Sequence, residues 1–452
     1  MLLTLRVQGA RHWLKSTRCL ASSAAPAKSP SSPPQLEVSG STYATDGWTN
    51  VTPKILSYVG ANKHLQTDHP LSIIRQRIVN YFYGAYRNQR GNPLFSVYDQ
   101  MNPVVTVQQN FDNLLIPADH VSRQKSDCYY INQQHLLRAH TTAHQVELIS
   151  GGLDNFLVVG EVYRRDEIDS THYPVFHQAD AVRLVTKDKL FERNPGLELF
   201  EETWSGTLAD PKLILPHPSS WTKPNSPATR RAVKLMEHEM KHVLVGLTKD
   251  LFGPRIKYRW VDTYFPFTQP SWELEIYFKD NWLEVLGCGI MRHEILQRSG
   301  VHQSIGYAFG VGLERLAMVL FDIPDIRLFW SNDSGFLSQF SEKDLHNLPK
   351  YKPISHYPQC TNDLSFWLPQ DIEVDAGFSP NDFYDLVRSV AGDMVEQISL
   401  VDKFKHPKTG KSSVCFRIVY RHMERTLTQA EVNEIHKQIA SASVDSFNVQ
   451  IR

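Results

Sequence analysis

The stretch that decides the fold is GEVYRRDEIDSTHYPVFHQ, which spans residues 160–178. Its two ends contain Val, Tyr and Phe, and its middle is polar. This pattern predicts a strand, a polar connection and a return strand. The planar fork of the Arg164 guanidinium donates two hydrogen bonds at once, which suits a phosphate. The alternative is a surface hairpin whose arginines pair with Asp166 and Asp169.

A second informative stretch is YAFGVGLERLAM, residues 307–318. Gly310 and Gly312 suggest a dinucleotide-binding loop, but the third glycine of that motif would fall at Arg315, so this interpretation fails. Two glycines instead let a backbone approach a ligand closely, and an arginine in the first turn of the following helix would project toward a bound phosphate. The alternative is a glycine-kinked core helix with a surface arginine.

The segments around these stretches predict a large sheet with helices. Residues 155–187 and 256–290 are rich in β-branched and aromatic residues and are expected to form antiparallel strands. A helix is expected to start at Pro70, because apolar residues then recur at helical spacing. These residues are Leu71, Ile74, Ile78 and Phe82. A proline-rich loop over 194–227 should precede a helix over 228–251.

The last part of the chain predicts a separate module. The expected elements are a strand at 364–368, a helix capped by Ser379, two strands around a turn at 406–411, a helix from Thr428 to about Ser443 and a strand at 447–451. Thr428 and Glu431 have the spacing of a capping box, and Pro380 suits a first helical turn. The order β-α-β-β-α-β is that of a ferredoxin-like module.

Length and composition bound the function. A chain of 452 residues is expected to form two or three domains. Lys plus Arg and Asp plus Glu number 48 each, so any RNA contact must come from local patches rather than a global positive field. No run of 18 apolar residues occurs, so no membrane span or membrane partner is expected.

The N-terminal residues 1–36 contain Arg and Lys but no Asp or Glu, which is typical of a mitochondrial transit peptide. The alternative is a disordered tail. Because residues 21–34 are rich in Ser and Pro, folded structure is expected to begin near residue 45. The cysteines form no CxxC pair and are expected to be reduced and mostly buried. They are Cys19, Cys128, Cys288, Cys360 and Cys415.

These stretches carry a resemblance to class II aminoacyl-tRNA synthetases, since 160–178 resembles motif 2 and 307–318 resembles motif 3. The first is closely similar to the version found in phenylalanyl-tRNA synthetases. Further stretches that resemble the catalytic subunit of that family are FDNLLIPADH (111–120), LRAHTTAHQ (137–145) and FPF (265–267). The C-terminal module resembles the family's anticodon-binding domain, and fusion on one chain resembles the mitochondrial single-chain form. The resemblance covers roughly residues 65–452.

The resemblance implies an α+β fold, with a class II antiparallel catalytic sheet flanked by helices and a ferredoxin-like anticodon-binding domain. The implied layout is a transit peptide at 1–36, a catalytic domain at 45–335, a linker at 336–354 and an anticodon-binding domain at 355–452. The implied reaction is ATP-dependent formation of phenylalanyl-adenylate, then transfer of phenylalanine to tRNA(Phe) in mitochondrial translation in the matrix. Motif 1 is weak around the helix from Leu71 to Tyr83 and at Pro103, which fits a monomer.

The resemblance also implies an ATP site. Its residues are Arg164, Thr171, His172, Tyr173, Phe176, Glu284 and Arg315. Arg164 would bind the α-phosphate and Arg315 the γ-phosphate, while Phe176 stacks on adenine. His172 would reach the outer phosphates and complete the catalytic set with the two arginines. Glu284 would lie at the ATP and Mg²⁺ site, where a hard cation prefers carboxylate oxygen; the alternative is a strand-end salt bridge.

A phenylalanine site is implied in the same way. Its residues are His140, Thr142, Ala143, His144, Gln145, Gln178, Asp180, Phe265, Phe267, Ala308 and Phe309. Because phenylalanine has no polar group on its side chain, selection must rest on shape and aromatic contact with Phe265 and Phe267, with Ala308 keeping the pocket deep. Thr142 and Asp180 stand where Ser and Glu are expected. Asp keeps the negative charge but is one methylene shorter, which admits a bridging water.

A basic segment over 402–425 is the expected tRNA contact, since only Asp402 and Glu424 oppose its cations. The implied tRNA-binding residues are Lys403, Lys405, Lys408, Lys411, Arg417, Arg421 and Arg425. Base stacking is a possible role for three aromatic residues that could equally be core. They are Phe383, Tyr384 and Phe404. The alternative is an ordinary solvated face.

Two rival functions remain open at this point. One is a class II ligase for another amino acid or another adenylate-forming ligase, and the other is a non-catalytic RNA-binding protein. FPF at 265–267 argues against the first, and the joint presence of Arg164, Glu284 and Arg315 against the second. If the two modules are separable, deletion from about residue 355 onward should spare adenylate formation and reduce tRNA charging.

Overall fold

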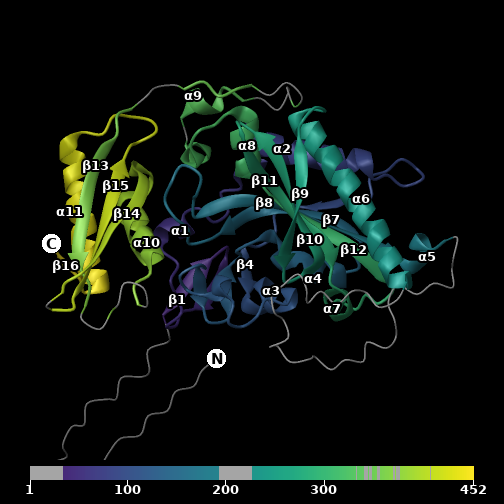
Figure 1. The fold of residues 1–452 in the computed structure, drawn as a ribbon, viewed down its shortest axis with the longest axis horizontal. Coiled ribbons are helices and arrows are strands. Elements are labelled where there is room, and N and C mark those ends of the chain that lie inside the picture. Colours follow the sequence, from purple (N-terminus) through teal and green to yellow (C-terminus); the bar gives the residue numbers. More distant parts are fainter. Residues whose placement is uncertain are drawn as a thin grey trace, which may run out of the picture.

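The computed structural model describes residues 34–192, 227–331, 333–340, 345, 349–353, 357–369, 372, 377–407 and 409–452. Figure 1 shows a larger unit and a smaller C-terminal unit side by side along the long axis. Nearly all of the predicted transit peptide and of the loop at 194–227 lies outside the described residues.

A seven-stranded sheet forms the centre of the larger unit. In spatial order its strands are β3 (Ser96–Tyr98), β7 (Asn155–Tyr163), β8 (Val175–Thr186), β12 (Ser304–Gly312), β11 (Asn281–Met291), β10 (Thr268–Phe278) and β9 (Tyr258–Phe265). All neighbours are antiparallel except β3 and β7, which are parallel. The predicted strands and the predicted hairpin at 160–178 are therefore confirmed.

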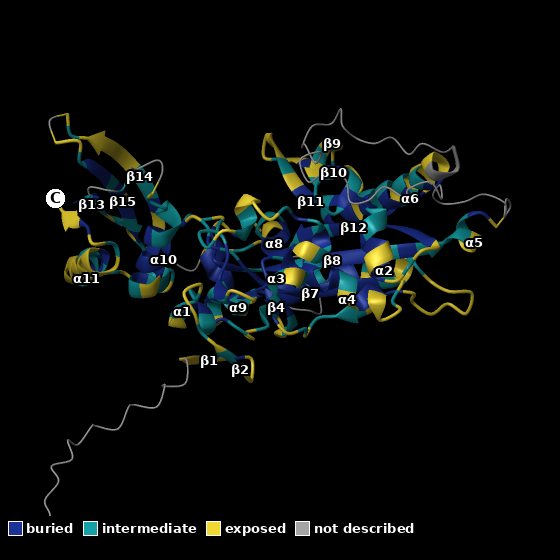
Figure 2. Ribbon diagram, turned by 90° about the horizontal axis from the view of Figure 1, so that it is seen from below, coloured by how far each residue is buried: buried dark blue, intermediate teal, exposed yellow. Residues whose placement is uncertain are grey.

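Helices cover both faces of this sheet, and the strands between them are mostly buried (Figure 2). On one face lie α2 (Pro70–Ala85), α6 (Pro227–Phe252) and α8 (Leu313–Phe321). On the other face lie α4 (Gln145–Ser150) and α7 (His293–Arg298). Because side chains alternate along a strand, Leu157 and Ala179 pack against the first group of helices, while Phe156 and Val182 pack against the second.

Smaller elements complete this unit. They are the sheet of β4 (Val104–Thr106), β6 (His135–Leu137) and β5 (Tyr130–Asn132), the helices α1 (Pro53–Leu56), α3 (Val107–Asn110), α5 (Lys187–Leu190) and α9 (Ser334–Leu337), and the 3₁₀ turns η1 (Lys63–Leu65), η2 (Asp112–Leu114), η3 (Val121–Arg123), η4 (Thr141–His144) and η7 (Ile326–Trp330). The turn η4 contacts β7 and β8 directly. It therefore belongs to the same face of the sheet as α4.

The predicted helices are confirmed. Pro70 occupies the first turn of α2, where its missing N–H costs no hydrogen bond. Its predicted apolar positions, from Leu71 to Phe82, are fully buried. The helix expected at 228–251 is α6.

The expectation that folded structure begins near residue 45 is wrong. Residues 35–44 form a hairpin of β1 (Gln35–Val38) and β2 (Ser41–Ala44), and Val38 is buried. The turn uses Ser39 and Gly40, both at positive φ. Such a two-residue turn with Gly at its second position suits a hairpin, and the polar composition of the preceding stretch obscured it.

The C-terminal unit has the predicted β-α-β-β-α-β order. Its elements are β13 (Cys360–Trp367), α10 (Pro380–Ala391), η9 (Gly392–Met394), β14 (Val395–Lys405), β15 (Ser412–Tyr420), α11 (Gln429–Phe447) and β16 (Gln450–Ile451). The sheet order is β14-β15-β13-β16, and both helices pack on one face of it. The capping box of Thr428 and Glu431 is present.

Two details of this unit differ from expectation. Ser379 occupies the N-cap of α10, but its hydroxyl makes no capping hydrogen bond. The helix α11 continues to Phe447 and ends where Asn448 adopts a left-handed conformation, so the last strand is only Gln450–Ile451. A helix is favoured over a strand in this segment because apolar residues such as Val432 and Ile439 share one buried face along it.

The four cysteines in the described part of the chain are free, as expected, and two of them, Cys128 and Cys288, are buried. Cys360 and Cys415 are half-buried, and Cys19 lies outside the described residues. Among the described residues, no helix is long and apolar enough to cross a membrane.

Candidate active site

A cavity of about 510 Å³ opens on the α4 side of the large sheet. Strands β7, β8 and β12 form its floor, the β9–β10 turn one side and η4 another. Eleven of the predicted site residues line it: His140, Thr142, Gln145, Arg164, Gln178, Asp180, Phe265, Phe267, Glu284, Ala308 and Phe309. The structure therefore brings together segments that are far apart in sequence.

Alternation along β8 explains why three of its predicted residues share one face. Phe176, Gln178 and Asp180 are two residues apart, so their side chains point to the same side of the strand. Ala179 and Ala181 point to the opposite side and are buried in the main core. The pattern of the return strand thus encodes one polar face and one core face.

One part of the cavity lining is a buried carboxylate. The Thr142 hydroxyl donates a hydrogen bond to the Asp180 carboxylate, so the two departures from the family pattern contact each other. Burial raises the pKa of Asp180 to about 6, against the lowering effect of the Thr142 hydrogen bond. Gly310 makes room for this carboxylate, because a Cβ there would lie 2.6 Å from Asp180 Oδ1.

Several buried polar atoms around Asp180 have no hydrogen-bond partner among the residues that the structure describes. They include both ring nitrogens of His140, both side-chain polar atoms of Gln145 and Oε1 of Gln178. All three residues line the cavity. Because a buried polar atom without a hydrogen bond is costly, these atoms are suited to a polar ligand such as an amino acid's ammonium and carboxylate groups.

Another part of the cavity lining is aromatic. The Phe265 and Phe267 rings stack with centroids 5.7 Å apart and planes inclined by 12°. Gly287 lies under Phe265, since a Cβ there would come 2.7 Å from the ring atom Cζ. Ala308 lines the same cavity and is buried. An apolar slot next to a carboxylate suits an amino acid with a flat apolar side chain.

Cationic groups lie at the open side. The Arg164 guanidinium sits over the Phe176 ring at 5.2 Å, and its Nε donates to the backbone oxygen of Ala139 at 2.8 Å. Arg315, in the first turn of α8, contacts Glu284 Oε2 at 3.0 Å, and both side chains are half exposed. A guanidinium beside an aromatic face suits the phosphate and base of a nucleotide.

The carboxylates here fit a divalent cation. Glu284 lines the cavity, and burial, followed by the charge of Glu284, raises the pKa of the Glu273 carboxyl on β10. Carboxylates supply the oxygen ligands that Mg²⁺ prefers.

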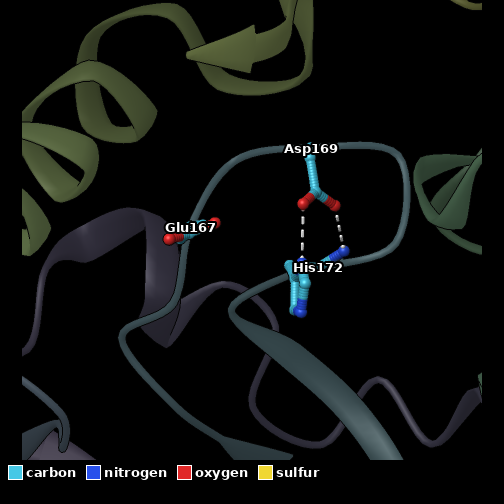
Figure 3. Close-up of side chains that lie close together, drawn as sticks. All are labelled: Glu167, Asp169 and His172. Carbon is cyan, nitrogen blue, oxygen red and sulfur yellow. Dashed lines mark hydrogen bonds and ion pairs between the residues drawn. The ribbon is translucent and has the colours of Figure 1, made fainter. Parts of the chain in front are cut away.

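The remaining predicted ATP-site residues lie elsewhere. Thr171 and His172 are on the exposed connection between β7 and β8, where Asp169 accepts hydrogen bonds from both. Figure 3 shows the two bonds between Asp169 and His172, with Glu167 farther along the loop. These three residues offer possible metal-ligand atoms within 4.8 Å of one another, but Asp169 already uses both oxygens to shape the loop.

Three other predicted residues face away from the cavity. Tyr173 is buried. Its hydroxyl lies within hydrogen-bond distance of the Tyr58 hydroxyl and donates to the carboxylate of Asp393. The ring of His144 bonds Arg138 at 2.9 Å, and Ala143 packs in a neighbouring cluster. These residues support the site rather than line it.

Other lining residues were not named as site residues from the sequence. They include Asp127, Cys128, Arg165 and Gly287. Arg165 pairs with Asp382 and Asp385 of α10, not with Asp166 and Asp169 as in the surface-hairpin alternative. No local sequence signal links residues 220 positions apart. The contact of Gly287 with Phe265 likewise depends on how the strands pack.

The predicted tRNA-binding residues divide into two groups. Lys403 and Lys405 are exposed on β14, Lys411 follows the turn, and Lys408 lies outside the described residues. Arg417, Arg421 and Arg425 each pair with a carboxylate of their own unit. The paired carboxylates are Asp363, Glu396 and Glu431.

The aromatic candidates for base stacking also divide. Phe383 and Tyr384 are buried in the core of the unit, so their alternative reading as core residues is confirmed. Phe404 is 36% exposed. It lies beside Trp367 on the sheet face that α10 and α11 leave open, and the Arg452 guanidinium sits over both rings at 5.3 and 5.5 Å.

Comparison with known proteins agrees with this geometry. Residues 57–197 and 232–340 match the class II core domain (F) of tRNA synthetases, and residues 355–452 match the ferredoxin-fold anticodon-binding domain. A probable mitochondrial phenylalanine–tRNA ligase of Drosophila melanogaster is 97% identical over 453 residues, covering 100% of both chains.

More distant relatives agree as well. A mitochondrial phenylalanine–tRNA ligase of Mus musculus is 52% identical, covering 92% of this chain and 89% of the mouse protein. One of Saccharomyces cerevisiae is 39% identical, covering 93% and 95%. The fold, the two matched domains and these full-length relatives establish that the chain belongs to the class II tRNA synthetase family with a C-terminal ferredoxin-fold anticodon-binding domain.

Proposed function

We propose that the chain is a phenylalanine–tRNA ligase. It forms phenylalanyl-adenylate from phenylalanine and ATP and then transfers phenylalanine to tRNA(Phe). The observation that carries the proposal is one cavity lined by both the stacked Phe265–Phe267 pair and the buried Asp180 carboxylate. The relatives named mitochondrial phenylalanine–tRNA ligases support the same substrate.

Phenylalanine is held by both parts of the cavity lining. Its ammonium group is attracted by Asp180, directly or through a water, and donates to Gln178 Oε1, while its carboxylate accepts from His140 and Gln145. Its ring occupies the slot beside Phe265 and Phe267. Tyrosine is disfavoured because its hydroxyl would be buried among apolar groups without a partner.

ATP use follows from membership of the family. Activation needs no protein nucleophile, because the ionised amino-acid carboxylate attacks the α-phosphorus and pyrophosphate leaves. Arg164 stabilises the charge that develops on the α-phosphate, Phe176 stacks on adenine and Arg315 holds the γ-phosphate. Glu284 would hold Mg²⁺, which neutralises phosphate charge. His172 reaches the outer phosphates from its exposed loop.

The C-terminal domain supplies tRNA contacts. The exposed lysines of β14 provide phosphate affinity, and Phe404 with Trp367 provides a face on which an unpaired base can stack. The arginines of the same segment add phosphate contacts through guanidinium N–H groups that their carboxylate partners do not use. They are Arg417, Arg421 and Arg425.

The names of the relatives indicate the mitochondrion, and we place the chain in the matrix as a monomer. The basic stretch predicted at 1–36 acts as the transit peptide, which then ends before β1. The domain boundaries proposed are 45–335 for catalysis, 336–354 for the linker and 355–452 for anticodon binding, with the β1–β2 hairpin added to the catalytic domain.

The test is amino-acid-dependent exchange of pyrophosphate into ATP by the purified chain alone, with phenylalanine, tyrosine and a panel of other amino acids. Exchange that is strongest with phenylalanine is the expected result. Stronger exchange with another amino acid would favour the rival ligase. Tight tRNA binding by folded protein without any exchange would favour the non-catalytic RNA-binding alternative.

A further inference from the structure

The helix α10 of the C-terminal domain lies against the connection between β7 and β8 (Figure 1). This connection carries Arg164 and borders the cavity. The contact is polar and largely buried. Arg388 donates to the backbone oxygens of Asp166 and Glu167, and Asn381 donates to that of Arg165 at 3.1 Å.

Asp385 lies at the centre of this contact. Its carboxylate accepts a hydrogen bond from Arg165 Nε and one from the Tyr129 hydroxyl at 2.7 Å, and Arg388 approaches it at 3.2 Å. The side chains of Arg165 and Asp385 are each 7% exposed. Asp382 contacts Nη2 of the Arg165 guanidinium at 2.9 Å, but is half exposed. Among the described residues, the carboxylates paired with Arg165 thus come only from the C-terminal domain.

Arg164 and Arg165 directly follow β7, and their side chains contact different parts of the protein. Arg164 turns toward Phe176 and Ala139 at the cavity, and Arg165 turns toward α10. Their backbone N–H groups are bound as well, to Pro174 and Asp127. Fixing Arg165 on one side therefore fixes the peptide from which Arg164 projects on the other.

We propose that Asp385 is a positioning residue for amino-acid activation, contributed by the anticodon-binding domain. This inference rests on the proposed function. The carboxylate holds Arg165, and through the shared backbone it sets the place of the Arg164 guanidinium at the α-phosphate. Because a displacement of about 1 Å can cost about 100-fold in rate, loss of this contact should slow the chemical step. The two domains are then not separable for activation, contrary to the expectation from sequence.

The test is Asp385→Asn in the full-length chain, compared with Asp363→Asn. Asp363 also pairs with an arginine of the same domain, Arg417, but on the exposed sheet face away from α10. Phenylalanine-dependent pyrophosphate exchange is measured without tRNA, and kcat is expressed per active site titrated by adenylate formation. Thermal unfolding is recorded for both variants.

Asp385→Asn is expected to lower kcat per active site by about tenfold or more, while KM for phenylalanine changes little because its pocket is untouched. Asp363→Asn should match the unsubstituted chain. Asp382→Asn, at a half-exposed site that tolerates the change, should give a smaller loss in the same direction.

A normal kcat per active site in Asp385→Asn would overturn the positioning role even if the melting temperature falls, since a purely structural contact changes the amount of folded enzyme and not its rate. If Asp385→Asn does not fold, normal kcat in Asp382→Asn would overturn it. Absence of phenylalanine-dependent exchange in the unsubstituted chain would instead overturn the proposed function on which the inference rests.

Discussion

Glu314 binds His177 through both carboxylate oxygens: Oε2 accepts from the backbone N–H at 2.8 Å, and Oε1 contacts Nδ1 at 2.7 Å. The strand β12 ends opposite Gln178 of β8. On that side of β8, the backbone N–H of His177 therefore has no partner in β12. Glu314, in the first turn of α8, takes that position. It ties the helix that carries Arg315 to the strand that carries Phe176.

Glu314→Gln should therefore damage both stability and activation. A hydrogen bond to a charged group contributes about 1.5–3 kcal/mol, and the amide would turn a donor toward His177. We expect a lower urea concentration at the midpoint of unfolding and a lower kcat for pyrophosphate exchange. Glu434→Gln, on the exposed side of α11, is the control and should change neither. Equal urea midpoints and equal kcat values for the two variants would contradict the role of Glu314 in linking α8 to β8.

Arg315→Ala should reduce kcat for pyrophosphate exchange by about 100- to 1,000-fold, the usual effect of losing one group that stabilises transition-state charge. The melting temperature should hardly change, because the Arg315–Glu284 pair is half exposed and such pairs contribute about 0–1 kcal/mol. Lys279→Ala, which breaks an exposed pair with Asp322, is the control. Near-normal exchange in Arg315→Ala would refute the phosphate assignment.

Acid should weaken phenylalanine capture through Asp180. Its pKa is raised to about 6, so the carboxylate is ionised above pH 6 and loses its charge as the pH falls below it. We expect kcat/KM for phenylalanine to fall by up to about tenfold per pH unit below 6. Burial lowers the pKa of His140 and of His144 to about 3, so neither titrates in this range. A pH profile from 5 to 8 that is unchanged in Asp180→Asn would assign the effect elsewhere.

The raised pKa of Asp180 affects the free energy of unfolding in the opposite direction: acid weakens phenylalanine capture but favours the folded state. Its protonated form is favoured in the folded state, so this contribution to the free energy of unfolding is present below pH 3.8 and is lost as the pH rises through about 6. Asp180→Asn should remove that loss and stabilise the protein at pH 8. Equal urea midpoints of the two proteins at pH 8 would argue against a buried charge.

Gly287→Ala should narrow the aromatic slot. The added Cβ would lie 2.7 Å from Phe265 Cζ, so the ring must move toward the substrate. Overpacking costs about 1–3 kcal/mol, which corresponds to a rise in KM for phenylalanine of about tenfold. Gly84→Ala is the control, because its Cβ meets nothing within 4 Å and alanine suits the helix α2. An unchanged KM in Gly287→Ala would show that Phe265 does not bound the substrate.

Phe404→Ala should separate the two steps of the reaction. Stacking of one base on an aromatic ring contributes about 1–3 kcal/mol, so KM for tRNA should rise while exchange without tRNA stays normal. Val401→Ala, at another exposed position of β14, should have no effect on either. Charging assays over a range of tRNA concentrations give the answer, and an unaltered KM would exclude Phe404 from the RNA contact.

Much of the fold could be predicted because its signals are local. The apolar spacing after Pro70, the capping box of Thr428 and Glu431 and the glycines before Arg315 each depend on residues a few positions apart. The errors arose where two local preferences compete. The hairpin at 35–44 lies next to a Ser- and Pro-rich stretch, and the last turn of α11 could equally have begun a strand.

By itself the sequence determined the main strands and helices of both units and the resemblance to a family. Only the tertiary structure decided which distant groups meet: Asp385 with Arg165, Glu314 with His177, and Gly287 with Phe265. The physical reason is that secondary structure follows from backbone preferences over a few residues. A buried contact instead depends on how strands and domains pack, which no short pattern encodes.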